Sequence, residues 1–235
     1  MQTKAVLFDL DGTLLPMDQD VFVKAYFKGI AKRLSAHGYE PEKLIEAIWL
    51  GTGAMIKNDG KKTNEQVFWE TFTKIFGEKA IYDQPHFEAF YRENFDDIAS
   101  VCGFSERASE VIKTVKEKGF KIALATNPIF PRIATEKRIK WAGLEKEDFA
   151  LITTYENSTC SKPNPKYYLE ITEKLGVTPS ECVMVGNDVS EDMVAEKLGM
   201  KVFLLKGCII NKNDADISVY PNGDFGELIK FLGSL

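Results

Sequence analysis

The sequence predicts an α/β fold, a doubly wound parallel sheet with an inserted all-helical cap domain. From about residue 100 onward, short apolar runs alternate with amphipathic stretches, which is typical of a parallel sheet covered by helices on both faces. An apolar run also occupies residues 4–8, far from the later ones. Between roughly residues 15 and 102 the pattern is helical and contains no convincing strand. We therefore expect a Rossmann-like core of residues 1–15 and 101–235, and a cap of residues 16–100.

The expected core elements follow from apolar runs and from helix-end signals. Strands are expected at residues 4–8, 121–126, 150–154, 182–186 and 202–205. Helices are expected at residues 105–118, 165–175 and 191–198, each followed by a glycine, and another near Pro131. Thr178 and Glu181 have capping-box spacing just before the fourth strand.

The cap is expected to be a bundle of the four-helix type. Its helices are predicted at residues 21–36, 41–50, 64–76 and 87–99. Thr63 and Gln66 form a candidate capping box for the third helix. Aromatic residues at helical spacing, and Trp49, Trp69 and Trp141, are interpreted as packing residues. The glycine-rich, basic segment 51–62 is either a flexible solvated loop or a loop that reaches over the site to read a leaving group.

Composition narrows the function. The 235 residues are 44% hydrophobic and 28% charged, which excludes a disordered or membrane-embedded chain. A net charge of −5 argues against a protein whose main task is to bind the nucleic-acid backbone. A small anionic substrate can still bind, because the local electrostatic potential at a site matters more than the total charge. The four cysteines lack CxxC spacing, and no apolar segment resembles a targeting signal. We expect a cytoplasmic protein without nucleic-acid or membrane partners, either a monomer or a homodimer.

The most informative stretch is Asp9-Leu10-Asp11-Gly12-Thr13, which follows the first apolar run. In an open parallel sheet, the carboxyl ends of the strands form the binding crevice. Two carboxylates this close repel each other, and a divalent cation placed between them and a substrate relieves the repulsion. Gly12 allows a sharp turn, and the Thr13 hydroxyl is a candidate donor to a substrate.

Three other strand ends carry polar residues of matching chemistry. Thr126 and Asn127 end the second core strand, where a hydroxyl, an amide and backbone N–H groups suit an anionic oxygen. Lys162 follows the third strand within a proline-rich turn that would fix its ammonium group. The fourth strand leads into residues 187–192, an acid-rich loop that offers oxygen ligands to a hard cation. Four such loops at one sheet edge point to a single site.

With these residues in order, the chain resembles the haloacid dehalogenase-like hydrolase superfamily over most of its length. Asp9 to Thr13 resemble the first motif, Thr126 the second, Lys162 the third, and Asn187-Asp188 with Asp192 the fourth. The helical insertion is similar to the cap of the phosphoglycolate-phosphatase-like branch. The resemblance implies Mg²⁺-dependent hydrolysis of a small phosphorylated metabolite. It also implies that the cap, connected near residues 14–18 and 100–105, closes over the site.

The resemblance also implies roles for the motif residues. Asp9 would be the nucleophile that forms an aspartyl-phosphate, and Asp11 the general acid and base whose backbone carbonyl also ligates the metal. Thr126, the Asn127 backbone and Lys162 would hold the phosphoryl oxygens. Asp192 would orient Lys162 or a metal-bound water.

The fourth motif departs from the family pattern, which usually opens with Gly-Asp, whereas this chain has Gly186-Asn187-Asp188. Counted from the glycine, Asn187 occupies the ligand position and supplies a neutral amide oxygen. If Asp188 turns inward instead, a carboxylate ligand is kept. Both residues are therefore candidate metal ligands, together with Asp9 and Asp11.

Other activities share parts of this pattern. A phosphomutase of the beta-phosphoglucomutase type shares all four motifs. A phosphonate hydrolase would need a cap lysine, for which Lys57, Lys61 and Lys62 are the candidates. A dehalogenase is disfavoured, because that branch lacks an acid equivalent to Asp11. A non-catalytic regulator is disfavoured by the full set of catalytic residues.

Overall fold

A computed structural model describes residues 2–235, and its centre is a six-stranded sheet in the order β3-β2-β1-β4-β5-β6. Every neighbouring pair of strands is parallel. The strands are β1 (Ala5–Phe8), β2 (Lys121–Leu124), β3 (Leu151–Ile152), β4 (Cys182–Gly186), β5 (Lys201–Leu205) and β6 (Asn222–Gly223). The strand order reverses direction between β1 and β4, which creates a switch point at their carboxyl ends.

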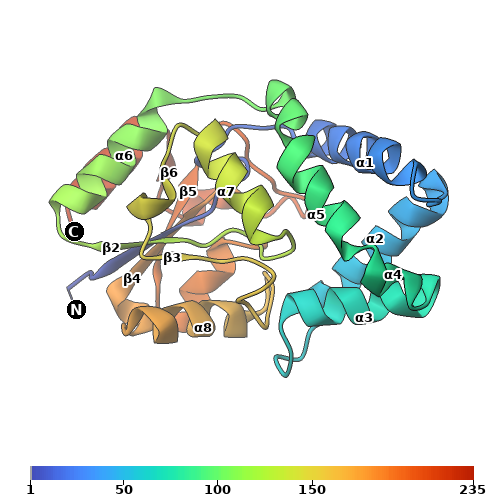
Figure 1. The fold of residues 1–235 in the computed structure, drawn as a ribbon. Coiled ribbons are helices and arrows are strands. Elements are labelled where there is room, and N and C mark those ends of the chain that lie inside the picture. Colours follow the sequence, from blue (N-terminus) through green and yellow to red (C-terminus); the bar gives the residue numbers. More distant parts are fainter. Residues whose placement is uncertain (1) are drawn as a thin grey trace.

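Helices cover both faces of the sheet (Figure 1). Val6 and Phe8 of β1 belong to one apolar cluster with α6 and α9, whereas Ala5 and Leu7 belong to a second cluster with α8. This division follows from the two-residue period of a strand. The elements of the core outside the sheet are α6 (Glu106–Glu117), α7 (Arg132–Trp141), η2 (Lys146–Asp148), α8 (Pro165–Leu175), η3 (Pro179–Glu181), η4 (Met193–Leu198), η5 (Ile217–Val219) and α9 (Phe225–Gly233). The expected α/β class is confirmed.

A helical segment lies between β1 and β2 in the chain and to one side of the sheet (Figure 1). It comprises α1 (Gln19–Ser35), α2 (Pro41–Ile56), α3 (Asn64–Phe76), α4 (Lys79–Tyr82), α5 (Gln84–Glu93) and the 3₁₀ helix η1 (Phe95–Val101). Both capping boxes predicted from the sequence are present, at Thr63 with Gln66 and at Thr178 with Glu181. Residues 2–235 contain no helix long and apolar enough to cross a bilayer.

Several expected boundaries are wrong. The helix expected at residues 87–99 divides into α5 and η1, and α4 adds a further helical turn, so a simple four-helix bundle is not formed. The helix expected at residues 191–198 begins at Met193 and is 3₁₀. The short β6 and the terminal α9 are absent from the sequence prediction.

The second expected cap helix is also longer than predicted, because α2 continues through Gly51 and Gly53 to Ile56. A Cβ atom at Gly51 would lie 2.6 Å from a ring carbon of Phe68, so glycine here permits close packing of α2 on α3. The first half of the segment interpreted as a loop, residues 51–62, is therefore helical.

Hydrogen bonds join the helical segment to the core at several places, including Lys137 and Trp141 of α7, which donate to Asp96 of η1. At its base, Met17 and Cys102 form an antiparallel bridge, and the Gly103 N–H donates to the Pro16 carbonyl at 2.7 Å. Farther out, the buried amide of Asn64 donates to the Pro128 carbonyl and to the Ser161 hydroxyl, both at 3.0 Å. The segment is thus attached both at its connections and near the loop that leads to Lys162.

Candidate active site

A cavity of about 150 Å³ opens at the carboxyl ends of the strands beside the switch point. Its walls include eight of the residues predicted from the sequence: Asp9, Asp11, Thr126, Asn127, Lys162, Asn187, Asp188 and Asp192. The ninth, Thr13, is buried directly beside them and contacts Asp9. The structure therefore brings all of the predicted site residues together, while their chemical roles stay predictions.

Asp9 follows the last residue of β1 and is held by two donors. Lys162 Nζ donates to Asp9 Oδ1 at 2.8 Å, and the Thr13 hydroxyl donates to Asp9 Oδ2 at 3.1 Å. Asp9 retains 7% exposure, so its carboxylate is nearly enclosed but still borders the cavity. These contacts fix the orientation of both carboxylate oxygens.

Lys162 lies between Asp9 and Asp192. Its ammonium also donates to Asp192 Oδ1 at 2.6 Å, and the second Asp192 oxygen accepts the Asp188 N–H at 2.9 Å. Burial lowers the pKa of Lys162, but the carboxylates of Asp192 and Asp9 outweigh it and hold that pKa well above its usual value. Lys162 is thus held in its charged form, and hydrogen bonds to both Asp192 and Asp9 fix the position of its ammonium group.

Asp11 is paired with Arg138, a residue that the sequence analysis missed. Arg138, from α7, is fully buried, donates to Asp11 Oδ2, and packs over the Phe130 ring at 4.6 Å. The other Asp11 oxygen is buried without a hydrogen-bond partner. Burial raises the pKa of Asp11, with Arg138 acting in the opposite direction and Asp9 adding to the rise. A raised pKa favours the protonated form that a general acid requires.

The structure separates the two fourth-motif candidates. Asn187 Nδ2 donates to the Cys208 carbonyl at 2.6 Å, which turns the amide oxygen toward the Thr13 hydroxyl, 3.0 Å away. Because Thr13 also contacts Asp9, its hydroxyl lies between the Asn187 oxygen and the Asp9 carboxylate. Asp188 instead uses Oδ1 to accept the N–H groups of Ser190 and Glu191.

Side chains of neighbouring segments hold Thr126 and Asn127 in place at the site. The Thr126 carbonyl accepts hydrogen bonds from the Thr153 hydroxyl at 2.7 Å and the Tyr167 hydroxyl at 2.8 Å. Asn127 donates to Glu191 Oε2 at 3.0 Å. Glu191, which the sequence analysis included in the acid-rich loop 187–192 without giving it a role, lines the cavity, and burial raises its pKa to about 7.

The candidate cap lysines lie elsewhere. Lys61 pairs with Asp59 and Lys62 with Glu70, all at exposed positions, and Lys57 is exposed. None of the three lines the catalytic cavity. The positions of these lysines therefore give the phosphonate-hydrolase alternative no support.

Trp49, which was interpreted from the sequence as a packing residue, is 52% exposed.

The described part of the chain, residues 2–235, contains no cluster of three or more His, Cys, Asp or Glu side chains that could by itself hold a metal ion. All four cysteines are free. A metal ion at this site would therefore depend on other oxygen donors, including the Asn187 amide.

Comparison with known proteins defines the class of protein. The model of the haloacid dehalogenase-like hydrolase family matches residues 3–198, and the chain belongs to this family of hydrolases. Among individual relatives, a phosphoglycolate phosphatase of Aquifex aeolicus is 25% identical, with 86% of this chain and 84% of that protein covered. The pyrophosphatase PpaX of Halalkalibacterium halodurans is 27% identical, with 86% and 82% covered.

The fold is shared with solved structures of the same superfamily. A HAD phosphatase from Thermococcus onnurineus superposes with a TM-score of 0.59 over 98% of both chains, at 24% sequence identity. At this identity the likeness establishes the fold, so the activity rests on the site itself.

Proposed function

We propose that the protein is a Mg²⁺-dependent phosphomonoester hydrolase that acts on a small phosphorylated metabolite through an aspartyl-phosphate. The observation that carries the proposal is the arrangement of Asp9, held by Lys162 and Thr13, beside an Asp11 whose pKa is raised. The phosphatase names of its relatives agree with this activity. The helical segment, residues 16–100, would act as the cap over the site.

Asp9 would act first. One of its carboxylate oxygens forms a bond to phosphorus, and the bond between phosphorus and the leaving oxygen breaks. Protonated Asp11 delivers its proton to that leaving oxygen, so the alcohol departs neutral. In the second step Asp11 removes a proton from water, and the water oxygen displaces Asp9 from phosphorus. Both aspartates thereby return to their starting states.

Cationic and polar groups would hold the phosphoryl oxygens during both steps. Lys162 is charged and fixed by two carboxylates, and Thr126 lies across the same cavity. Negative charge that develops on the phosphoryl oxygens is therefore met by preorganised groups that need no rearrangement.

The residues fit a magnesium ion. Asp9, the Asp11 backbone carbonyl and the Asn187 amide oxygen are hard oxygen donors, and one buried Asp11 oxygen lacks a partner. Mg²⁺ commonly takes one or two carboxylates and completes its shell with waters and substrate phosphate, so a dense carboxylate cluster is not required. When bound, it would offset the repulsion between the Asp9 carboxylate and an anionic phosphate. The contacts of Asp188 with backbone N–H groups favour Asn187 as the ligand.

The test is phosphate release from sugar phosphates, nucleotides and phosphoglycolate, with Mg²⁺ and with a chelator. We expect turnover that requires Mg²⁺ and that Asp9→Asn abolishes, because the amide cannot attack phosphorus. Asp59→Asn makes the same chemical change at an exposed position that pairs with Lys61, and it should leave turnover intact.

The assay also separates the alternatives. Isomerised product without inorganic phosphate would contradict the hydrolase proposal and favour a phosphomutase. Asp9→Asn activity equal to that of the parent would contradict the assignment of the nucleophile.

A further inference from the structure

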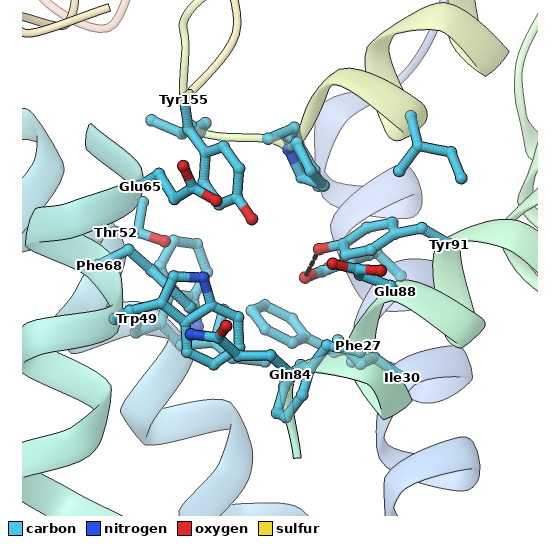
Figure 2. A pocket seen from close by; sticks show the side chains of 18 of the residues that line it. Phe27, Ile30, Trp49, Thr52, Glu65, Phe68, Gln84, Glu88, Tyr91 and Tyr155 are labelled. Atoms are coloured by element: carbon cyan, nitrogen blue, oxygen red, sulfur yellow. Dashed lines mark hydrogen bonds between the residues drawn. The ribbon is translucent and has the colours of Figure 1, made fainter. Parts of the chain in front are cut away.

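A second cavity, of about 110 Å³, adjoins the catalytic one. Figure 2 shows it between the helical segment and the core. Its walls come from α1, α2, α3 and α5 and from the core residues that follow β2 and β3. Val23, Ile129 and Phe130 line both cavities, so the two share a wall. A phosphoester with its phosphorus at Asp9 would place its leaving group in or beside this second cavity.

The walls of the second cavity are unusually aromatic. Nearly half of its lining residues are Phe, Tyr or Trp, compared with 11% of the whole chain. The rings support one another: Phe27 packs on Trp49 with centroids 5.3 Å apart, and Tyr26 packs on Phe130 at the same distance. The hydroxyls of Tyr26 and Tyr91 are hydrogen-bonded to each other at 2.8 Å. A packed ring wall of this kind presents many electron-rich faces.

The ionisable side chains of the cavity wall are also acidic. Glu65 and Glu88 line it from opposite sides in Figure 2, whereas its described lining residues include no Lys, Arg or His. Burial raises the pKa of Glu65, and the neighbouring carboxylates of Glu156 and Glu88 raise it further. Glu88 also lies 3.8 Å from Arg92, but both side chains are largely exposed, and solvent screens such a pair.

We infer that this cavity selects a leaving group that carries an aliphatic quaternary ammonium, an inference that rests on the proposed phosphatase activity. Aromatic faces attract such a cation, and a carboxylate beside them supplies the countercharge. A neutral apolar group would use the rings but leave Glu65 partly desolvated without a partner. An anionic group would be repelled by the glutamates. A quaternary ammonium donates no hydrogen bonds, so leaving water costs it less than it costs a primary ammonium.

Phosphocholine and 3,3-dimethylbutyl phosphate provide the turnover test. The two esters have the same shape, but one carries a cationic nitrogen where the other has a neutral carbon. We expect kcat/KM for phosphocholine to exceed that of the neutral ester by about tenfold or more, a difference of about 1.4 kcal/mol. Glu65→Gln should reduce this ratio severalfold. The parent and the variant are assayed with the same two esters. The difference in acidity between the two alcohols released therefore cancels when the two ratios are compared.

Glu70→Gln is the matched control. Glu70 lies on the same helix as Glu65 but at an exposed position, paired with Lys62, and it does not line the cavity. Its substitution should leave the ratio unchanged. An equal decrease in both variants would overturn the role of Glu65.

Binding of choline alone, measured by calorimetry against 3,3-dimethylbutanol, separates this inference from the activity. Hydrolysis of p-nitrophenyl phosphate without any preference for phosphocholine and without choline binding would overturn the cation site but leave the proposed function standing. Choline binding that Glu65→Gln weakens, in a protein that hydrolyses no ester, would support the cation site and overturn the proposed function. A preference for the neutral ester would overturn the inference in favour of an apolar leaving group.

Discussion

At the scale of single residues, Asn187 is where this chain departs most clearly from its family. An amide at a ligand position supplies an oxygen without negative charge, so it should weaken the affinity for Mg²⁺ compared with a carboxylate. The amide nitrogen is meanwhile used as a donor to the Cys208 carbonyl. With Asn187 as a metal ligand, this departure would lower the affinity for Mg²⁺ while it keeps a structural contact with the neighbouring loop.

This departure gives a testable prediction. Asn187→Asp should lower the Mg²⁺ concentration at half-maximal activity by about tenfold, because a carboxylate replaces the amide oxygen. It should also lower Tm, because the new oxygen faces the Cys208 carbonyl. The measurement is a Mg²⁺ titration of phosphate release, combined with thermal denaturation.

Asp188→Asn is the matched control, since it keeps an oxygen that can accept the N–H groups of Ser190 and Glu191. It should change the Mg²⁺ requirement much less. A larger effect at residue 188 than at residue 187 would identify Asp188 as the ligand instead.

The site residues could be predicted from the sequence because each lies in a segment that follows the carboxyl end of an apolar strand. Arg138 could not be predicted in this way, because it lies within a helix rich in basic residues, Arg132, Lys137 and Lys140 among them. A periodicity signal does exist: Arg138 shares the buried face of α7 with Ala134 and Ala142. That pattern identifies a buried cation, but the identity of its partner, Asp11, depends on tertiary packing.

At the scale of elements, the capping boxes and the longer strands were well predicted, whereas short elements were not. β6 contains two residues, too few for any periodic pattern. α9 did carry a signal, because Asp224 and Glu227 form a capping box at its start. The division between α5 and η1 has no comparable signal in residues 87–99, since packing against α1 and α7 decides where the helix changes.

Glu181 caps the 3₁₀ helix η3 and also connects it to the start of β1. Glu181 accepts the Thr178 N–H at 2.9 Å and pairs with Lys4 just before β1. The Lys4 contact and the Thr178 N–H lower the pKa of Glu181 to about 2. The stabilisation is therefore fully present above the ordinary pKa of a glutamate, about 4.5, and is lost as the pH falls toward 2.

We accordingly predict that Glu181→Gln lowers Tm by about 1–3 °C at pH 7, because glutamine keeps the capping contact but loses the ion pair. At pH 3 the difference should be less than half as large. Thermal denaturation between pH 7 and pH 3 measures it. Glu227→Gln, at the same position in the capping box of α9 but with no lysine partner within residues 2–235, reports the effect of removing the charge where no ion pair is lost. An equal difference at both pH values would contradict the assigned ion pair.

At the scale of the whole molecule, we propose that the helical segment closes over the site, and the contacts of Asn64 would then make this conformation the closed one. Its side chain bridges α3 to the Pro128 carbonyl and the Ser161 hydroxyl, far from the connections at Pro16 and Gly103. Opening about these connections would break the Asn64 contacts. Loss of buried hydrogen bonds of this kind costs about 1–3 kcal/mol, which is enough to shift a balance between open and closed forms.

Asn64→Ala should therefore increase the radius of gyration of the ligand-free protein, and vanadate with Mg²⁺ should restore the parent value. Thr63 remains the N-cap of α3, so the helix itself should persist. Small-angle X-ray scattering measures the change. Asn211→Ala, in a loop where Asn211 contacts Ala215, serves as the control. Identical profiles for parent and Asn64→Ala, with and without vanadate, would contradict the closing motion.

The central place of β1 has a consequence during synthesis on the ribosome. This apolar strand is made before its partners, which begin at Lys121 and Cys182. All six helices of the inserted segment emerge before the first partner strand, and they can fold through local contacts while β1 is still unpaired. The nascent chain therefore carries an exposed apolar edge for most of translation, a condition that favours chaperone binding and makes early release of the chain prone to aggregation.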